Sequence, residues 1–225
     1  MPRQEASKVF DEYTDQYDAW YDTVKGRALL ATEVACLRPL LDQFPRPYLE
    51  VGVGTGRFSQ ALEIEHGIDL SAPALELARG RGVSVRQASG EQIPFKDSLF
   101  GGVLMALTLC FVDDPDAAVR EARRVLMPGG GLVLGLLLKG TPWADSYARR
   151  GQEGHPTYRS ARFHTKSEVE SLLREGGFSI VRYRSTLFQK HGLKTYEIEA
   201  PVEGFAEGAG FVGLAAVKAG HEVQT

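Results

Sequence analysis

The sequence predicts an α/β protein in which helices cover both faces of a mostly parallel sheet. A short apolar segment at residues 48–51 reads as a strand and runs directly into a turn with glycine at positions 52, 54 and 56. The apolar run at residues 102–109 has the character of a parallel strand that is buried on both faces. Strand-like and helix-like segments alternate along most of the chain, as expected when crossover helices join parallel strands.

Length and composition restrict the class of protein further. The 225 residues suffice for one well-buried α/β domain and are short for two, so we expect a single domain over 1–225. A net charge of −3 provides no general attraction for nucleic acid or anionic membranes. The two cysteines lack metal-ligand spacing, no signal peptide is visible, and the most apolar stretch, 100–112, is too short to span a bilayer. We therefore expect a cytoplasmic protein without metal, nucleic-acid partner or membrane insertion; the sequence leaves a homodimer open.

Two helices are expected before the first strand. Residues 4–22 place apolar and aromatic side chains at three- and four-residue spacing with acids between them, and residues 27–42 show a second, leucine-rich helical pattern. The first helix carries an aromatic stripe, which either docks the helix on the core or faces a ligand. Its members are Tyr13, Tyr17, Trp20 and Tyr21.

The middle and end of the chain continue the alternation. Only seven residues lie between Arg57 and Glu65, so the helix after the glycine turn must be short. Asp113 and Asp114 suit the start of a helix better than a metal site, and Thr165 with Glu168 forms a capping-box pattern. The expected helices are 57–62, 72–82, 116–126 and 165–175, and the expected strands are 66–70, 83–87, 127–138, 178–186 and 211–218.

The glycine turn is the strongest functional signal. Glycine at alternate positions lets the chain bend sharply and brings bare backbone close to a ligand. The nicotinamide fingerprint G-x-G-x-x-G would need its third glycine at position 57, which is Arg57. A nicotinamide-binding turn is therefore weakened but open, and so is a purely structural turn.

Asp69 stands at the end of the strand that follows the turn. A carboxylate in this place can accept hydrogen bonds from the two hydroxyls of a ribose. Alternatively, Asp69 could cap the helix that starts near Pro73, although Ser71 is available for that role.

The G-x-G-x-G spacing, with Glu50 two residues before it, resembles the first motif of class I S-adenosylmethionine-dependent methyltransferases. FDEYTDQYDAWYD (10–22) resembles the N-terminal helix of the small-molecule branch of that family, and EARRVLMPGGGLVLG (121–135) resembles its segment before the fifth strand. The resemblance covers roughly residues 8–185 and points to the methyltransferase type 11, quinone-biosynthesis-like group. It implies the class I methyltransferase (Rossmann-like) fold, with a seven-stranded sheet whose last strand is antiparallel, and S-adenosyl-L-methionine as cofactor.

The resemblance also implies where the cofactor lies. The segment 88–100 resembles the second motif, whose loop meets the adenine, and the acid usual in that motif falls on Ser89. Aromatic residues of the first helix would close over the sulfonium, which is attracted to aromatic faces. The predicted cofactor contacts are Glu50, Gly52, Gly54, Thr55, Gly56, Asp69, Leu70, Ser89, Gly90, Glu91, Leu107, Tyr13 and Tyr21.

A small-molecule acceptor is expected beneath a helical lid formed by residues 1–45. Residues 139–166 look irregular, and a long irregular stretch in a compact domain is usually functional or disordered. The basic and aromatic composition of this insert suggests the wall of a pocket for an anionic or aromatic molecule, or else a solvated loop. The predicted acceptor contacts are Tyr17, Trp20, Tyr158, Arg159, Arg162 and Phe163.

Methyl transfer from a sulfonium is an in-line displacement in which the enzyme contributes mainly alignment and exclusion of water. A base is needed only if the nucleophile must lose a proton. His155, His164 and Cys110 are the candidates, although Cys110 also suits a small buried packing residue. An RNA-directed enzyme, a non-catalytic cofactor-binding protein and a nicotinamide-dependent oxidoreductase remain alternatives.

Overall fold

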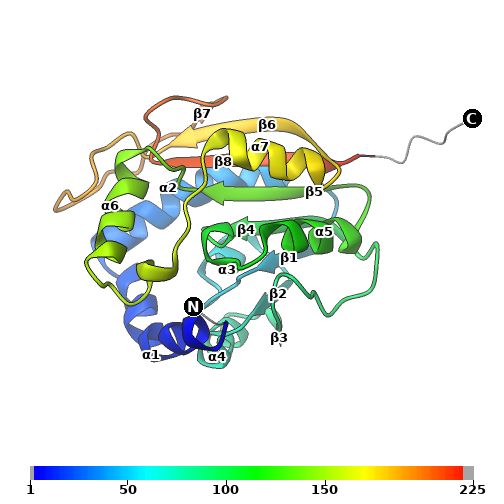
Figure 1. Ribbon diagram of the computed structural model, residues 1–225, viewed down its shortest axis with the longest axis horizontal. Coiled ribbons are helices and arrows are strands. Elements are labelled where there is room, and N and C mark those ends of the chain that lie inside the picture. Colours follow the sequence, from blue (N-terminus) through cyan, green and yellow to red (C-terminus); the bar gives the residue numbers. More distant parts are fainter. Residues whose placement is uncertain (1–2, 220–225) are drawn as a thin grey trace, which may run out of the picture.

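A computed structural model describes residues 3–219, with side chains described from residue 10 onward. Eight strands form one sheet in the order β3-β2-β1-β4-β5-β8-β6-β7 (Figure 1). Their bounds are β1 Tyr48–Val51, β2 His66–Asp69, β3 Ser84–Gln87, β4 Phe100–Ala106, β5 Leu126–Leu136, β6 Phe178–Thr186, β7 Val202–Glu203 and β8 Phe211–Lys218.

The sheet is mostly parallel, as predicted. Strands β1 to β5 pair in parallel, and β8 inserts antiparallel between β5 and β6. The expected count of seven strands was wrong by one, because the two-residue β7 pairs with the edge of β6. Ion pairs from Arg182 and Arg184 to Glu203 hold this short strand. Such a contact between distant residues leaves no alternating pattern in the sequence.

The helices lie close to their predicted positions. Side-chain caps at Thr23, Ser71 and Asp114 start α2, α4 and α5, and the capping box of Thr165 and Glu168 starts α7 as expected. The bounds are α1 Arg3–Tyr21, α2 Val24–Leu41, α3 Arg57–Leu62, α4 Ala72–Gly80, α5 Pro115–Val125, α6 Pro142–Gln152 and α7 Lys166–Glu175, with the 3₁₀ turns η1 Leu109–Phe111 and η2 Tyr158–Ser160.

Residues 139–166 are more regular than the sequence suggested, because they contain α6 and η2. The hydroxyl of Thr141 accepts a hydrogen bond from the Ala144 amide, and Pro142 occupies the first turn, where it needs no amide partner. Trp143 and Tyr147, one turn apart, bury one face of the helix. The prediction that residues 139–166 are irregular was wrong. The apolar face of α6 extends over little more than one helical turn, which is too short to show a helical period in the sequence.

Strand β4 separates two cores. Every residue of β4 is buried, which confirms the prediction of a strand covered on both faces. Val103 and Met105 face the core beneath α5 and α7, and Leu104 and Ala106 face the core beneath α2. This alternation is the period of a strand. In Figure 1, α5 and α7 accordingly lie in front of the sheet and α2 behind it.

The carboxyl ends of the parallel strands meet at one edge of the sheet. Figure 1 shows α6 at the end toward which β5 points, with α1 below it. Ligands of open α/β sheets bind at this edge. Within residues 3–219, no helix is long and apolar enough to cross a membrane.

Candidate active site

The glycine turn between β1 and α3 requires glycine at each of its three positions. Gly52, Gly54 and Gly56 have φ values of 74°, 50° and 83°, in the left-handed region. A Cβ on Gly52 would lie 2.4 Å from the Thr108 side chain, and one on Gly56 would lie 2.9 Å from Ala78 Cα. A Cβ on Gly54 would meet nothing within 4 Å. The middle of the turn therefore presents bare backbone to open space.

Asp69 joins the end of β2 to this turn. Its Oδ2 accepts a hydrogen bond from the Gly54 amide at 2.8 Å, and its Oδ1 accepts one from the Ser71 amide at 2.9 Å. Burial raises the pKa of Asp69 despite these bonds. The cap of α4 is Ser71, whose hydroxyl accepts from the Ala74 amide. The alternative in which Asp69 caps α4 is therefore not what the structure has.

Glu50 lies behind the turn in β1. It is 1% exposed, and its Oε2 accepts a hydrogen bond from the Ser59 hydroxyl of α3 at 2.5 Å. Burial raises the pKa of Glu50 to about 8. This carboxyl group is therefore largely protonated at neutral pH, and it links β1 to the helix that follows the turn.

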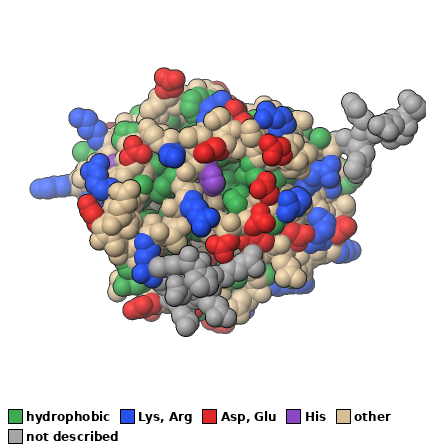
Figure 2. Space-filling view, in the orientation of Figure 1, with side chains coloured by type: hydrophobic (Ala, Val, Ile, Leu, Met, Phe, Trp, Pro, Cys, Tyr) green, Lys and Arg blue, Asp and Glu red, His purple; other side chains and the backbone are tan. Residues whose placement is uncertain are grey.

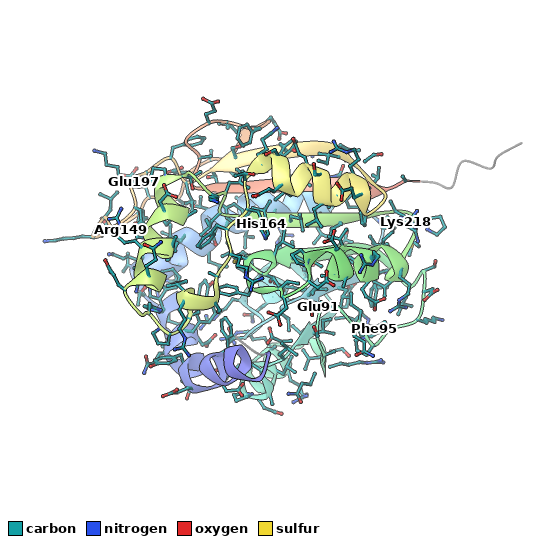
Figure 3. The ribbon with its side chains drawn as sticks, in the orientation of Figure 1. Glu91, Phe95, Arg149, His164, Glu197 and Lys218 are labelled. Atoms are coloured by element: carbon teal, nitrogen blue, oxygen red, sulfur yellow. The ribbon has the colours of Figure 1, made fainter. Side chains whose placement is uncertain are left out.

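The loop after β3 lies beside β1 and the start of α5. A Cβ on Gly90 would come within 2.8 Å of the Val51 side chain, so the backbone packs closely there. The Ser89 hydroxyl donates to the Glu91 carboxylate, which also accepts from the Asp113 amide at 3.1 Å. Figure 3 shows Glu91 at the front of this loop.

Two further predicted cofactor contacts lie at strand ends. Leu70 follows β2 and is 38% exposed, which is unusual for a large apolar side chain. Leu107 follows β4 with φ 56°, an uncommon conformation for a branched residue. The structure thus brings Leu70 together with the glycine turn and Asp69, and places Leu107 at the end of the neighbouring strand.

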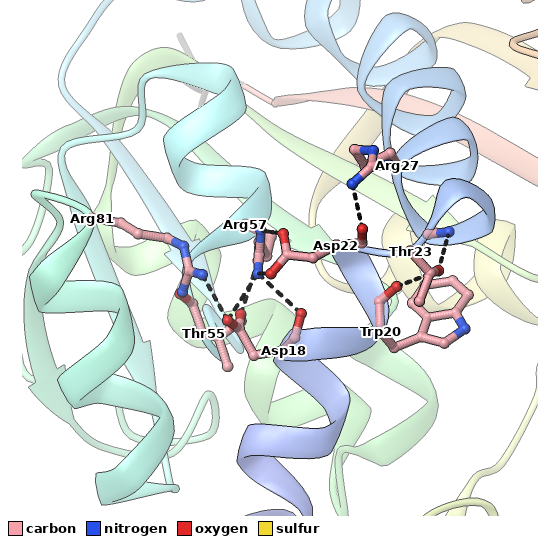
Figure 4. Close-up of polar contacts among 9 residues, drawn as sticks. Asp18, Trp20, Asp22, Thr23, Arg27, Thr55, Arg57 and Arg81 are labelled. Carbon is pink, nitrogen blue, oxygen red and sulfur yellow. Dashed lines mark hydrogen bonds and ion pairs between the residues drawn. The ribbon is translucent and has the colours of Figure 1, made fainter.

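A charged cluster fastens α1 to the glycine turn (Figure 4). Arg57 donates from Nε and Nη2 to the two oxygens of Asp18, both at 2.9 Å, and also contacts Asp22 at 2.8 Å. Arg81 donates to Asp18 Oδ2 at 2.7 Å and to the Thr55 carbonyl oxygen at 2.6 Å. Burial raises the pKa of Asp18, but hydrogen bonds from Arg57 and Arg81 outweigh this and lower it to about 2. None of these ion pairs was among the contacts predicted from the sequence.

The aromatic stripe of α1 divides into buried and exposed members. Tyr21 is 4% exposed, and its hydroxyl lies 2.9 Å from that of Tyr17. The rings of Tyr17 and Trp20 are 47% and 37% exposed and each packs edge-on against Tyr21. Tyr13 is half-buried.

The segment 139–166 contributes aromatic rings rather than charges to the interior. Tyr158 packs against Tyr147 and His155 with ring centroids 4.7 and 4.6 Å apart, and Phe163 is half-buried. Arg159 and Arg162 have exposed side chains, and Arg149 lies at the outer edge of α6 in Figure 3. The expected arginine lining is therefore found at the surface.

A small, mostly apolar cavity lies at the carboxyl ends of β4 and β5. Its lining includes Leu107, Cys110, Leu138 and His164, and Figure 3 places His164 beside the segment that leads into α7. Burial raises the pKa of Cys110 to about 12, so this thiol stays protonated. Burial lowers the pKa of His164, whose Nε2 is buried with no hydrogen-bond partner among residues 10–219, whose side chains are described. His155 lies apart from this cavity lining, against Tyr158.

Nothing in the described part of the chain groups three or more histidine, cysteine or acidic side chains closely enough to hold a metal ion.

A mostly parallel sheet with this strand order, an open glycine turn and a carboxylate fixed beside it defines an α/β protein of the class I methyltransferase type. Residues 49–134 match the family model described as a methyltransferase domain. A Mycobacterium tuberculosis protein, Rv2003c, is 54% identical over 98% of this chain and 77% of its own length. The demethylmenaquinone methyltransferase of Thermus thermophilus is 30% identical over 56% of this chain and 63% of its own length.

A solved structure from Thermotoga maritima covers nearly the whole fold. It is described as a SAM-dependent methyltransferase and possible histamine N-methyltransferase, and it is 36% identical with a TM-score of 0.86 over 95% of this chain and 99% of that one. The chain belongs to the S-adenosylmethionine-dependent methyltransferases, and S-adenosylmethionine is its cofactor.

Proposed function

We propose that the protein methylates a small organic molecule that binds beneath α1 and α6, at the carboxyl ends of β4 and β5. The observation that carries this proposal is the bond between Asp18 and Arg57, which holds α1 against the glycine turn. A helix held there leaves less open space in front of the carboxyl ends of β4 and β5. A small acceptor therefore fits better than a large one. Residues 1–45 would then act as the lid of a single domain over 1–225.

The residues around the turn fit the cofactor. The open backbone at Gly54 admits a ligand in close contact, and Asp69 keeps lone pairs that can accept hydrogen bonds from ribose hydroxyls. The exposed side chain of Leu70 offers an apolar surface, and we assign the loop of Ser89, Gly90 and Glu91 to the adenine. When bound, the cofactor supplies an electrophilic methyl group. Tyr13 and Tyr21 are the lid residues that we place near it.

The protein's own contribution to the reaction is positioning and the exclusion of water. The cavity beside Leu107 places apolar groups at the end of β4. His164 has a buried free nitrogen in that lining and a lowered pKa, so it is neutral near pH 7 and can receive a proton from a nucleophile. We assign Cys110 to packing, since its thiol remains protonated.

The names of two relatives support a small acceptor, whereas a relative from Bos taurus is named as a probable tRNA methyltransferase. The Thermotoga protein is described with a small amine as its possible acceptor, and the Thermus protein is named for demethylmenaquinone. The charges on the face drawn in Figure 2 are interspersed, without the continuous basic surface typical of nucleic-acid binding.

Two measurements test the function. Calorimetry with S-adenosylhomocysteine and with NAD should show binding of the first alone. Release of S-adenosylhomocysteine from S-adenosylmethionine should then be followed with panels of small amines, phenols and quinols, and with bulk tRNA at several salt concentrations. Turnover with a small molecule is the expected result. Turnover with tRNA alone, or no binding of S-adenosylhomocysteine by folded protein, would refute the proposal.

A further inference from the structure

Glu33 is a buried carboxylate on α2 that the preceding sections leave without a role. It is 7% exposed, and no hydrogen bond or ion pair to its side chain occurs among the described side chains of residues 10–219. Its neighbour Thr32, also buried, instead bonds the Ala28 carbonyl oxygen. An unpaired buried carboxylate is costly, and burial raises the pKa of Glu33 to about 8.

The position of Glu33 directs it toward the acceptor side of the site. Leu29 and Leu37, one turn before and after it on α2, belong to the same buried cluster as Trp143 of α6. Residues four apart share one face of a helix. Tyr147 of α6 and Leu107 at the end of β4 pack against this cluster as well. Glu33 therefore lies on the face of α2 that contributes to this cluster.

Four tyrosines from three elements approach this region. The ring centroids of Tyr17 and Tyr21 are 5.2 Å apart, and those of Tyr147 and Tyr158 are 4.7 Å apart. The charge of Glu33 contributes to the raised pKa values of Tyr17, Tyr21 and Tyr147, so it acts on rings of both α1 and α6. Aromatic faces attract cations. A carboxylate among such faces forms an environment for positive charge.

No cation of the described chain neutralises Glu33. Arg150 lies over the Tyr158 ring at 5.2 Å but is exposed. Burial lowers the pKa of both His155 and His191, which keeps these rings neutral near pH 7. The basic residues of the insert, which favoured an anionic acceptor in the sequence, are at the surface.

We propose that Glu33, with the rings of Tyr17, Tyr21, Tyr147 and Tyr158, binds the positively charged end of an organic ammonium acceptor. This inference rests on the proposed function and specifies its substrate class. Burial keeps Glu33 largely protonated in the free protein at pH 7.5. An ammonium beside it favours the ionised form, so the carboxyl group releases its proton to solvent when the ligand binds. The resulting carboxylate supplies the counter-charge, and the rings supply cation–π attraction. A neutral molecule of the same shape gains neither, and an anion is repelled.

The first test uses the complex with S-adenosylhomocysteine and three probes of similar size. 2-Phenylethylamine, 2-phenylethanol and 3-phenylpropionate are titrated by calorimetry at pH 7.5. The amine should bind at least about ten-fold more tightly than the alcohol, a difference of about 1.4 kcal/mol, and the carboxylate should bind most weakly. Equal affinities for the amine and the alcohol would overturn the proposal. Failure of S-adenosylhomocysteine itself to bind would instead refute the proposed function.

The second test assigns the effect to Glu33. Glu33→Gln keeps the shape and removes the charge, so amine affinity should fall about ten-fold while affinities for the alcohol and for S-adenosylhomocysteine stay unchanged. Glu197→Gln, which removes the same charge at an exposed carboxylate (Figure 3), is the matched control and should change nothing. Unchanged amine affinity in Glu33→Gln would overturn the proposal. A loss of S-adenosylhomocysteine affinity would also overturn it, by placing Glu33 in the cofactor site. If Glu33→Gln does not fold, Tyr158→Ala against Tyr158→Phe serves instead: the first should lose amine binding and the second keep it.

Discussion

Arg57 binds Asp18 through two parallel contacts, from Nε to Oδ1 and from Nη2 to Oδ2, each 2.9 Å long. This paired geometry is the strong form of an arginine–carboxylate interaction. Both side chains are mostly buried, at 16% and 14% exposure. Arg57 occupies the position where a nicotinamide-binding turn has its third glycine. The residue that departs from that fingerprint is thus the one that fastens α1.

Asp18→Asn should loosen α1 without unfolding the sheet. The amide cannot accept charge-assisted bonds from both Arg57 and Arg81, and a hydrogen bond to a charged group is worth about 1.5 to 3 kcal/mol. We expect faster hydrogen exchange over residues 10–21 and about ten-fold weaker binding of S-adenosylhomocysteine. Glu76→Gln, which breaks the exposed pair of Glu76 with Arg79, is the control. Protection of α1 equal to that of the parent would show that the helix is held elsewhere.

Glu33→Gln should change how stability depends on pH. The folded-state pKa of Glu33 is raised to about 8 from 4.5, so the folded protein binds a proton more tightly than the unfolded chain. The corresponding stability is complete below about pH 4.5 and is lost as the pH rises toward 8. The glutamine of the variant does not titrate, so the variant keeps its stability where the parent loses some. The melting temperature of the variant relative to that of the parent should therefore rise from pH 5 to pH 8. Several degrees are expected, since about 1 kcal/mol corresponds to about 2 to 4 °C in a protein of this size.

Melting curves of the parent, Glu33→Gln and Glu197→Gln at pH 5, 6, 7 and 8 check this. A constant difference between the first two across the series would mean that Glu33 titrates normally in the folded protein.

Asp69→Ala should weaken binding of S-adenosylhomocysteine by about 1.5 to 3 kcal/mol, the value of hydrogen bonds to a charged group. The side chain also holds the Gly54 amide, so both the ligand and the turn lose a partner. Ser71→Ala is the matched control, because it removes the cap of α4 at a cost of about 1 kcal/mol of stability and leaves the carboxylate in place. Calorimetry should separate the two variants; equal ligand affinities would refute the ribose assignment.

Gly54→Ala and Gly52→Ala should fail in different ways. A Cβ at Gly54 meets nothing within 4 Å, so the cost to folding is only the left-handed backbone, about 1 to 2 kcal/mol. Its methyl group nevertheless projects into the space that we assign to the cofactor, so binding should fall sharply. A Cβ at Gly52 lies 2.4 Å from Thr108 and should destabilise the fold directly. Melting temperatures and S-adenosylhomocysteine affinities, measured together, check the contrast; parental affinity in Gly54→Ala would make this glycine purely structural.

Much of the fold follows from local patterns. Strand β1 and helix α3 occur where the apolar segment and the glycine turn placed them, and β6 and β8 match their predicted bounds. Helix α6 was missed although Thr141 and Pro142 mark its start, because its short apolar face is mixed with arginines. Strand β7 was missed because it has no alternating pattern of apolar and polar residues. Ion pairs to Glu203 stabilise it instead.

The sequence by itself determined the fold class, since periodicity, caps and glycine spacing act over a few neighbouring residues. Its resemblance to the class I methyltransferases pointed to the family and the cofactor. Asp18 and Asp22, one turn apart on α1, were a visible signal for a partner, and so was Glu33 on a leucine-rich helix face. Their roles depended on tertiary structure. Arg57 binds Asp18, which is 39 positions away in the chain. The charge of Glu33 affects the pKa values of Tyr17 and Tyr147 only because the fold brings α1, α2 and α6 together. The same packing left Arg159 and Arg162 in solvent, because a charged side chain stays hydrated unless the fold brings it a partner.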